Sequence, residues 1–131
     1  MNVKEGLVKT YALDRMSHLN LLQDTFKMPD DINPSEFFKD CFGIITNKNS
    51  AKRIVLRVEP TQAKYFRALP LHPSQQEEIH DNYSIVSYTM RITYDLKEEL
   101  MSHGASIEVL EPKELKTLIC TELEQALKNY Q

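Results

Sequence analysis

Alternation of apolar and polar residues predicts four β-strands in the second half of the chain. In the clearest case, from Val86 to Tyr94, every even position is apolar and every odd position is serine, threonine or arginine. Successive side chains of a strand point to opposite faces, so this pattern is typical of a sheet with one buried and one polar side. The predicted strands are residues 52–60, 75–80, 84–94 and 105–111.

Between and after these strands, apolar residues recur with the helical period. Helices are predicted over 61–69, 95–104 and 112–131, the last with Pro112 in its first turn. The order is strand, helix, strand, strand, helix, strand and a further helix. With right-handed crossovers this order predicts an α+β fold, the ferredoxin-like split β-α-β sandwich. We expect a four-stranded antiparallel sheet with helices on one face, central first and third strands, and an additional C-terminal helix.

The first half of the chain shows weaker patterns. A hairpin is predicted over residues 3–16, where the alternation turns around Gly6. A hairpin alone is not stable in water, so it either packs on the rest of the chain or is the edge of a preceding domain. Helical spacing predicts two linking helices, over 16–26 and 35–45. The polar, turn-rich stretch that follows indicates a domain boundary near residue 50.

The composition is that of a folded protein, with 41% apolar and 27% charged residues in a chain of 131. No apolar run approaches the roughly 18 residues that a membrane span needs, and no signal peptide is evident. We therefore expect a cytoplasmic protein without a membrane partner. Cys41 and Cys120 stand in helix-like apolar patterns, apart from any metal-ligand spacing, so buried reduced thiols are expected.

The net charge of −3 is unevenly distributed: residues 47–67 are mostly basic and residues 95–124 mostly acidic. In the predicted sheet, Arg53, Arg57 and Arg91 lie side by side on the face that the helices leave uncovered. Three guanidinium groups there could hold phosphates bidentately. The alternative is a solvated face whose charges pair internally. The acidic neighbours expected in that case are Glu108 and either Glu77 or Glu78.

The stretch LPLHPSQQEEI places a histidine and a serine in a turn before the second predicted strand. Nucleophilic catalysis needs a third orienting group and an oxyanion donor, and Pro73 is expected to prevent a hydrogen bond between His72 and Ser74. Because proline extends the residue before it, a structural turn is favoured over a ligand contact by His72, which stays a candidate. Neither the other histidines nor the three glycines show the spacing of a metal or phosphate site, so no metal or cofactor is predicted.

Several stretches carry a family resemblance. IVLRVEPTQAKYFRALPLHPSQ and LMSHGASIEVLEPKELK resemble the WCX domain, the C-terminal extension of bacterial WYL-family transcriptional regulators. VKTYALDRM is similar to the closing strand of the WYL domain, a small Sm-like β-barrel. The chain has no tryptophan, so the Trp-Tyr-Leu signature is absent, as are most barrel strands. The resemblance implies a C-terminal fragment of a regulator, with residues 1–16 ending the WYL domain, 17–50 a helical linker and 51–131 the WCX domain.

The resemblance also implies a function and a site. The family is thought to sense an effector, with single-stranded nucleic acids or nucleotide-like anions as the leading class. The signal would pass to a helix-turn-helix domain, absent from this chain, that binds DNA. Arg15 matches the basic residue at the end of the barrel motif, whereas Ala12 stands where relatives often carry arginine. An ion pair of Arg15 with Asp14 or Asp24 is the alternative.

Two functions from different classes remain. The first is a non-catalytic effector-sensing and dimerisation region of a WYL-type regulator, with a homodimer expected from exposed Tyr65, Leu69 and Leu71. The second is a stand-alone metabolite-binding protein or a small enzyme on a ferredoxin-like scaffold, since a fold does not fix function. The sequence shows no cluster of acid, base and nucleophile, which favours the first.

Overall fold

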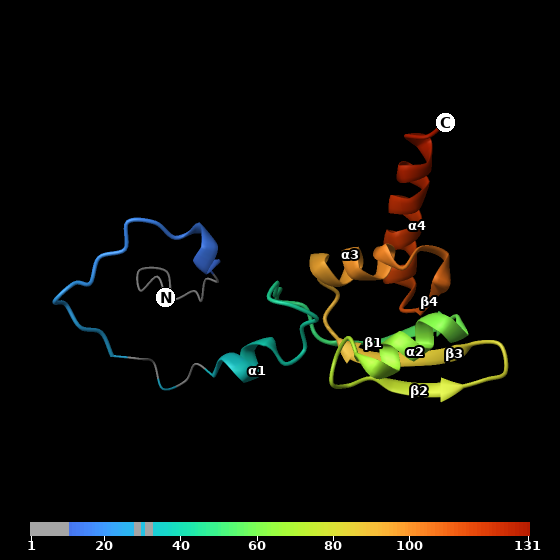
Figure 1. Ribbon diagram of the computed structural model, residues 1–131, viewed down its shortest axis with the longest axis horizontal. Helices are drawn as coiled ribbons and strands as arrows, with labels where there is room; N and C mark the ends of the chain where they lie inside the picture. Colours follow the sequence, from blue (N-terminus) through green and yellow to red (C-terminus); the bar gives the residue numbers. More distant parts are fainter. Residues whose placement is uncertain (1–10, 28–29, 31–32) are drawn as a thin grey trace. The chain divides into compact units, whose positions relative to one another are not determined.

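The structure, a computed structural model, describes residues 11–27, 30 and 33–131. The chain divides into two compact units, Met1–Asn33 and Pro34–Gln131. The second unit contains the sheet and its helices (Figure 1). Its main elements are α1 (Pro34–Phe38), β1 (Lys52–Val58), α2 (Pro60–Ala68), β2 (Gln76–Ile79), β3 (Ser84–Met90), α3 (Tyr94–Ser102), β4 (Ile107–Glu111) and α4 (Lys113–Lys128).

The sheet has the strand order β2-β3-β1-β4, so the first and third strands are central. All three pairings are antiparallel. The two central strands pair along their whole length, from Lys52 opposite Met90 to Val58 opposite Ser84. The predicted α+β fold, with its four-stranded antiparallel sheet and C-terminal helix, is confirmed.

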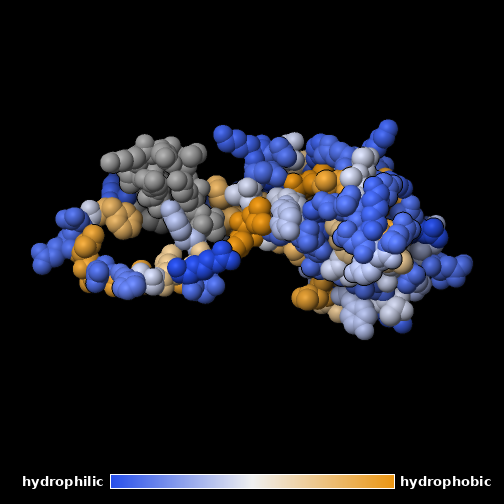
Figure 2. Space-filling view, turned by 90° about the horizontal axis from the view of Figure 1, so that it is seen from above, coloured by the Kyte–Doolittle hydropathy of each residue, from blue (hydrophilic) through white to orange (hydrophobic). Residues whose placement is uncertain are grey.

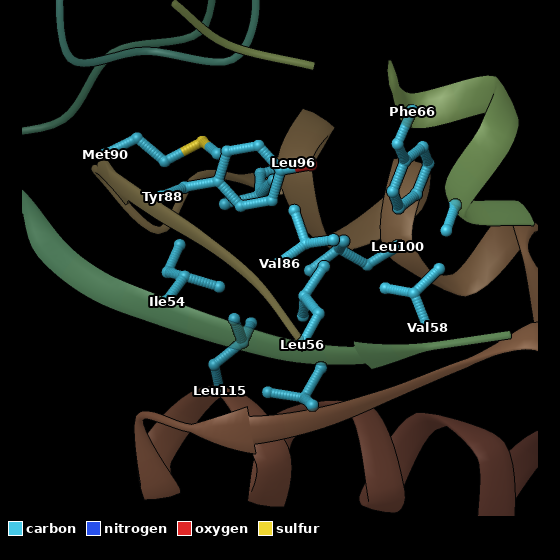
Figure 3. Close-up of a cluster of buried hydrophobic side chains, with 12 residues drawn as sticks. Ile54, Leu56, Val58, Phe66, Val86, Tyr88, Met90, Leu96, Leu100 and Leu115 are labelled. Carbon is cyan, nitrogen blue, oxygen red and sulfur yellow. The ribbon is translucent and has the colours of Figure 1, made fainter. Parts of the chain in front are cut away.

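One face of the sheet forms the core. Alternate residues of β1 and β3 point to this face, and Figure 3 shows them meeting side chains from the helices in one cluster. Each large aliphatic side chain buried there stabilises the fold by about 1.5–3 kcal/mol. The buried members are Ile54, Leu56, Val58, Ala63, Phe66, Val86, Tyr88, Met90, Leu96, Leu100, Val109 and Leu115.

Three helices supply the covering layer. α2 begins at Pro60, whose fixed φ suits the first turn, and buries Phe66. In α3, Leu96 and Leu100 lie one turn apart and are both buried. α4 buries only Leu115, and Figure 1 shows its C-terminal turns extending away from the sheet. The apolar stripe predicted for this last helix is therefore largely exposed beyond its first turns.

Some elements of the second unit are shorter than predicted. β3 ends at Met90 because the next backbone N–H, that of Arg91, donates to the carbonyl oxygen of Asp40 at 2.7 Å. The helix expected over 35–45 ends at Phe38. After it, the chain folds back onto the domain, and Phe42 packs against the core cluster. Residues 39–47 therefore form part of the compact unit that holds the sheet.

The first unit departs further from its prediction. Leu13–Arg15 form a 3-10 turn where the end of a hairpin was expected, and the rest of that hairpin, up to residue 10, lies outside the described residues. Residues 16–26 form no helix, and Leu19 and Phe26 are exposed. Helices in proteins are stabilised mostly by packing of their apolar face, and no residue from 11 to 27 is buried.

Among the described residues, no helix combines the length and the apolar character needed to cross a membrane. The face of the molecule shown in Figure 2 is mostly hydrophilic, with hydrophobic residues in small groups. Cys41 is buried as predicted, whereas Cys120 lies exposed on α4. The prediction of a buried thiol was therefore wrong for Cys120, because in its turn of α4 it is Ile119 that packs against the core cluster.

Candidate functional site

The side of the sheet opposite the core carries the predicted arginines of β1, and we call it the open face. Arg57 lies between Ile85 of β3 and Glu108 of β4 in the strand register, and Arg53 lies opposite Thr89. Both arginines are exposed. The alternation in β1 thus places its arginines on the side away from the helices, as predicted.

Arg57 has an aromatic partner but no acidic one. Its Cζ atom lies 4.6 Å from the ring centroid of Tyr83, a cation–π contact of about 0.5–1 kcal/mol at an exposed site. The ring of His80 stacks on the same tyrosine, with 4.5 Å between the ring centroids. Glu108 stands opposite Arg57 in the register, yet its carboxylate binds Lys116 Nζ at 3.0 Å instead. Among the described residues, Arg57 forms no salt bridge.

A cleft of about 300 Å³ opens beside Arg57, at the end of the sheet where β1 leads into α2. One wall is held by the backbone, since the Glu59 N–H donates to the Ser106 carbonyl oxygen at 2.9 Å. Arg57 and Glu59 bring opposite charges to this cleft. We call it the Arg57 cleft, and its lining residues are Arg57, Val58, Glu59, Asn82, Tyr83, Ala105, Ser106, Ile107 and Glu108.

Arg53 forms a separate cationic position. Its Nη1 lies 3.8 Å from Glu111 Oε2, and both side chains are more than half exposed. An exposed pair at this distance contributes little to stability. Arg53 is four positions from Arg57 on one strand, a Cα separation of about 13 Å. One phosphate group would therefore meet only one of the two guanidinium groups.

Arg91 does not join them, which corrects the prediction of three arginines side by side. Its Nη1 donates to the Asn47 carbonyl oxygen at 2.8 Å and to Thr46 Oγ1 at 3.1 Å. Its Nη2 lies 3.8 Å from Asp40 Oδ2. The arginine is held in this way because β3 stops at Met90 and residues 40–47 approach the chain there.

The acidic neighbours also differ from expectation. Glu108 neighbours Arg57 in the register as predicted. Glu77, however, binds Arg67 of α2 through two hydrogen bonds of 2.7 and 2.8 Å, so it belongs to the helix-covered side. These hydrogen bonds hold the pKa of Glu77 below its usual range, against the opposing effect of burial. Glu78 lies 3.2 Å from His80 and does not pair with the arginines.

His72 is buried and fixed by hydrogen bonds at both ring nitrogens. Its Nε2 donates to the Lys39 carbonyl oxygen at 2.7 Å, and its Nδ1 accepts from the Ser74 backbone N–H at 3.2 Å. Ser74 Oγ lies 2.7 Å from the same Nδ1 and accepts from the Thr89 N–H at 2.9 Å. The expectation that Pro73 keeps His72 and Ser74 from hydrogen bonding was wrong, because the turn brings the two side chains back together.

The hydrogen bonds of His72 and Ser74 connect parts of the fold and do not form a catalytic site. The ring nitrogen opposite Ser74 binds a backbone carbonyl oxygen, whereas a catalytic triad has a carboxylate opposite its serine. The serine oxygen is occupied by the β3 backbone at Thr89. Residues 39–47 are therefore tied to the domain from two sides, by His72 and by Arg91. The ligand contact considered for His72 gains no support, because its ring nitrogens are already paired within the protein.

The remaining predicted site residue, Arg15, lies exposed in the 3-10 turn of the first unit. Among residues 11–27, 30 and 33–131, no ion pair joins Arg15 to Asp14 or Asp24. Within the described residues no three His, Cys, Asp or Glu side chains are grouped so that they could hold a metal ion. Sequence reasoning missed Tyr83 and Glu59; the signal for Tyr83 was its place just before β3, in the loop at the Arg57 end of β1.

Comparison with known proteins identifies the domain. A model of the WCX domain family matches residues 50–127, a range that spans the whole sheet and includes the Arg57 cleft. A search among curated proteins found no match. The WCX domain is the C-terminal extension of WYL-domain transcriptional regulators, a non-catalytic family. Because the match covers more than half of the chain, this protein belongs to the WCX domain family.

Proposed function

We propose that this chain is the effector-sensing region of a WYL-type regulator and that the Arg57 cleft binds a nucleotide-like anionic ligand. The observation that carries the proposal is the guanidinium group of Arg57, which stacks on Tyr83 and has no acidic partner among the described residues. Family membership supports the regulatory role. The ligand and its site are the part of the proposal that experiment has to establish.

The chemistry of the cleft fits an oxyanion. A guanidinium group presents N–H donors in a planar fork that matches two oxygens of a phosphate or carboxylate. The contact with Tyr83 positions this guanidinium group, and the Arg57 side chain stays exposed to a ligand. Lys116 neutralises Glu108, the acidic residue opposite Arg57. Arg57 and Glu59 remain as the charged residues of the cleft that form no ion pair among the described residues, so an oxyanion is favoured on the Arg57 side of the cleft.

The size of the cleft favours a small ligand. A volume of about 300 Å³ is at the lower end for sites that bind small molecules. This volume suits a mononucleotide. A longer single-stranded nucleic acid would have to continue along the open face, where Arg53 stands about 13 Å from Arg57.

The proposal has three further parts. Residues 1–16 would end a WYL domain and residues 17–50 would link it to the sheet domain. The ligand signal would reach DNA through a helix-turn-helix domain elsewhere in the regulator. A homodimer is proposed from Tyr65 and Leu69, whose side chains are exposed on and beside α2. Leu71 was expected to be exposed with them, but it is partly buried and packs against the core cluster.

The decisive experiment measures operator binding by the full-length regulator with and without candidate effectors. Mononucleotides and short single-stranded DNA or RNA are added, and operator affinity is followed by fluorescence anisotropy at constant salt, since salt changes affinity for nucleic acids strongly. We expect a ligand to change operator affinity about tenfold, a typical coupling of about 1.4 kcal/mol. If no anionic ligand changes operator binding, the proposal fails.

Two matched variants locate the ligand. Arg57→Gln and Arg53→Gln remove the same charge from the same strand and the same face. We expect Arg57→Gln to abolish the response to a mononucleotide, whereas Arg53→Gln should preserve it. A response that is equal in both variants and in the unmodified protein would exclude the Arg57 cleft as the site.

The dimer is tested separately by analytical ultracentrifugation of the 131-residue chain. We expect a concentration-dependent dimer that Tyr65→Ser with Leu69→Ser converts to a monomer. A chain that sediments as a monomer at high concentration would remove this part of the proposal.

A further inference from the structure

We infer that Glu59 reads the base of the bound nucleotide, so that the Arg57 cleft prefers bases that carry an exocyclic amino group, such as cytosine, over uracil. The inference rests on the proposed function, which places a nucleotide in this cleft. It adds a second contact with a defined chemistry. Arg57 would hold the phosphate, and the Glu59 carboxylate would accept a hydrogen bond from the amino group of the base.

The backbone fixes Glu59 firmly while its side chain stays free. Its N–H donates to the Ser106 carbonyl oxygen, and its own carbonyl oxygen accepts from the Ala63 N–H, both at 2.9 Å. Glu59 stands at the N-cap of α2, yet its carboxylate makes no capping hydrogen bond. Among the described residues it forms no ion pair either. A side chain that recognises a base needs a fixed backbone and a carboxylate that is not already hydrogen-bonded within the protein, and Glu59 has both.

The charge of Glu59 argues for a ligand with a donor group. A carboxylate can only accept hydrogen bonds at neutral pH, and it would repel a ligand that is purely anionic. Glu59 and Arg57 line the same cleft but do not form a salt bridge with each other. A ligand with an oxyanion at one end and an amino group at the other would satisfy both. Acceptance from the cytosine N4 amino group is an established role of Glu in base recognition.

The spacing of the two residues fits a ligand longer than a simple ion. Glu59 follows the last residue of β1 in extended backbone, two positions after Arg57, which places their Cα atoms about 6.6 Å apart, and both residues line the cleft. Inorganic phosphate could reach only Arg57. A mononucleotide carries its phosphate and its base amino group at opposite ends, and its base could lie against the guanidinium plane, as bases do in RNA recognition.

Isothermal titration calorimetry on the 131-residue chain tests the inference with CMP, UMP and inorganic phosphate. CMP and UMP differ in the base edge, where an amino group replaces a carbonyl oxygen. We expect CMP to bind about tenfold more tightly than UMP, within the range known for a good base contact. Inorganic phosphate should bind more weakly than either nucleotide.

Three variants test whether the Glu59 carboxylate makes the contact with the base. Glu59→Ala should bring the CMP-to-UMP affinity ratio to about one and should not weaken UMP, because a repelling carboxylate is lost. Arg57→Gln should weaken both nucleotides about equally. Glu111→Ala removes an acidic side chain from the other end of the open face and should leave the ratio unchanged. Circular dichroism shows whether each variant remains folded.

The outcomes separate the two proposals. Equal affinity for CMP and UMP, with both lost in Arg57→Gln, overturns the reading role of Glu59 and leaves the nucleotide site standing. A CMP preference that persists in Glu59→Ala overturns it as well. If neither nucleotide binds the unmodified chain, both the inference and the nucleotide site are wrong.

Discussion

The two faces of the sheet are built from alternate residues of the same strands, yet from Arg53 to Val58 of β1 they differ in exposure everywhere except at Val55, which is 7% exposed although it lies on the open face. On the helix-covered face, Ile54, Leu56 and Val58 of β1 have no exposed surface. On the open face, Arg53 and Arg57 of the same strand stand exposed. One strand therefore supplies both the core and the candidate ligand contacts. Neighbouring positions should have separable roles, with stability on one side and recognition on the other.

The largest effect is expected on the covered face. Leu56→Ala leaves a cavity in the core cluster and should lower the free energy of unfolding by about 2–5 kcal/mol. Urea denaturation measures this loss. The matched control is Leu127→Ala, since Leu127 is 57% exposed and lies outside the proposed dimer contact, and its effect should stay within about 0.5 kcal/mol. Equal losses in the two variants would break the comparison between covered and exposed positions.

A smaller effect is expected where residues 39–47 join the sheet domain. His72→Ala removes hydrogen bonds from Lys39 and Ser74, and unpaired buried groups should lower the free energy of unfolding by about 1–3 kcal/mol. Hydrogen exchange should show faster exchange in residues 39–47 than in β1. His80→Ala, at a half-buried histidine beside the open face, is the control. Unchanged exchange in residues 39–47 would show that His72 does not hold them.

The covered face should also show the clearer pH dependence. The Arg67 hydrogen bonds lower the pKa of Glu77, so its stabilisation is present above the unfolded value of about 4.3 and is lost as the pH falls through the folded value. Glu77→Gln should therefore lose less unfolding free energy than the unmodified protein between about pH 5 and pH 3. Glu78→Gln, an exposed neighbour, should follow the unmodified protein. Identical pH profiles for all three proteins would contradict the assignment.

The smallest change in stability is expected at the candidate ligand contact itself. Arg57→Gln loses the contact with Tyr83, which should reduce the free energy of unfolding by no more than about 1 kcal/mol. Thermal denaturation at neutral pH measures this difference. A loss as large as that of Leu56→Ala would make Arg57 a structural residue and would remove the separation of roles between the two faces.

The sequence was sufficient for the fold because local patterns decide it. The alternation through β1 and β3 assigns each side chain to a face, and the order of elements then selects the strand order. The placement of Arg53 and Arg57 follows from the same alternation. Tertiary contacts decide the rest, and the position of Arg91 is the clearest example. Its side chain binds residues 46 and 47, which are distant from it in sequence. No sequence pattern near Arg91 predicts these hydrogen bonds.

Two further features were hidden for different reasons. The hydrogen bond between His72 and Ser74 depends on the exact path of a turn through Pro73, and residue preferences describe such paths only statistically. In the sequence, Glu59 is the one acidic residue within the basic range 47–67, and no motif surrounds it. Glu59 lines the cleft because its backbone N–H hydrogen-bonds to Ser106, a residue distant in sequence that lines the same cleft. The sequence alone does not show this contact.

The central strand β3 has a different neighbour at each end. Tyr83, at the Arg57 cleft, immediately precedes its first residue, and Arg91, which holds residues 40–47, immediately follows its last. A single seven-residue strand thus spans the distance from the cleft to the attachment point of the preceding chain. The cleft and the attachment point of residues 40–47 are therefore anchored to one continuous element of secondary structure.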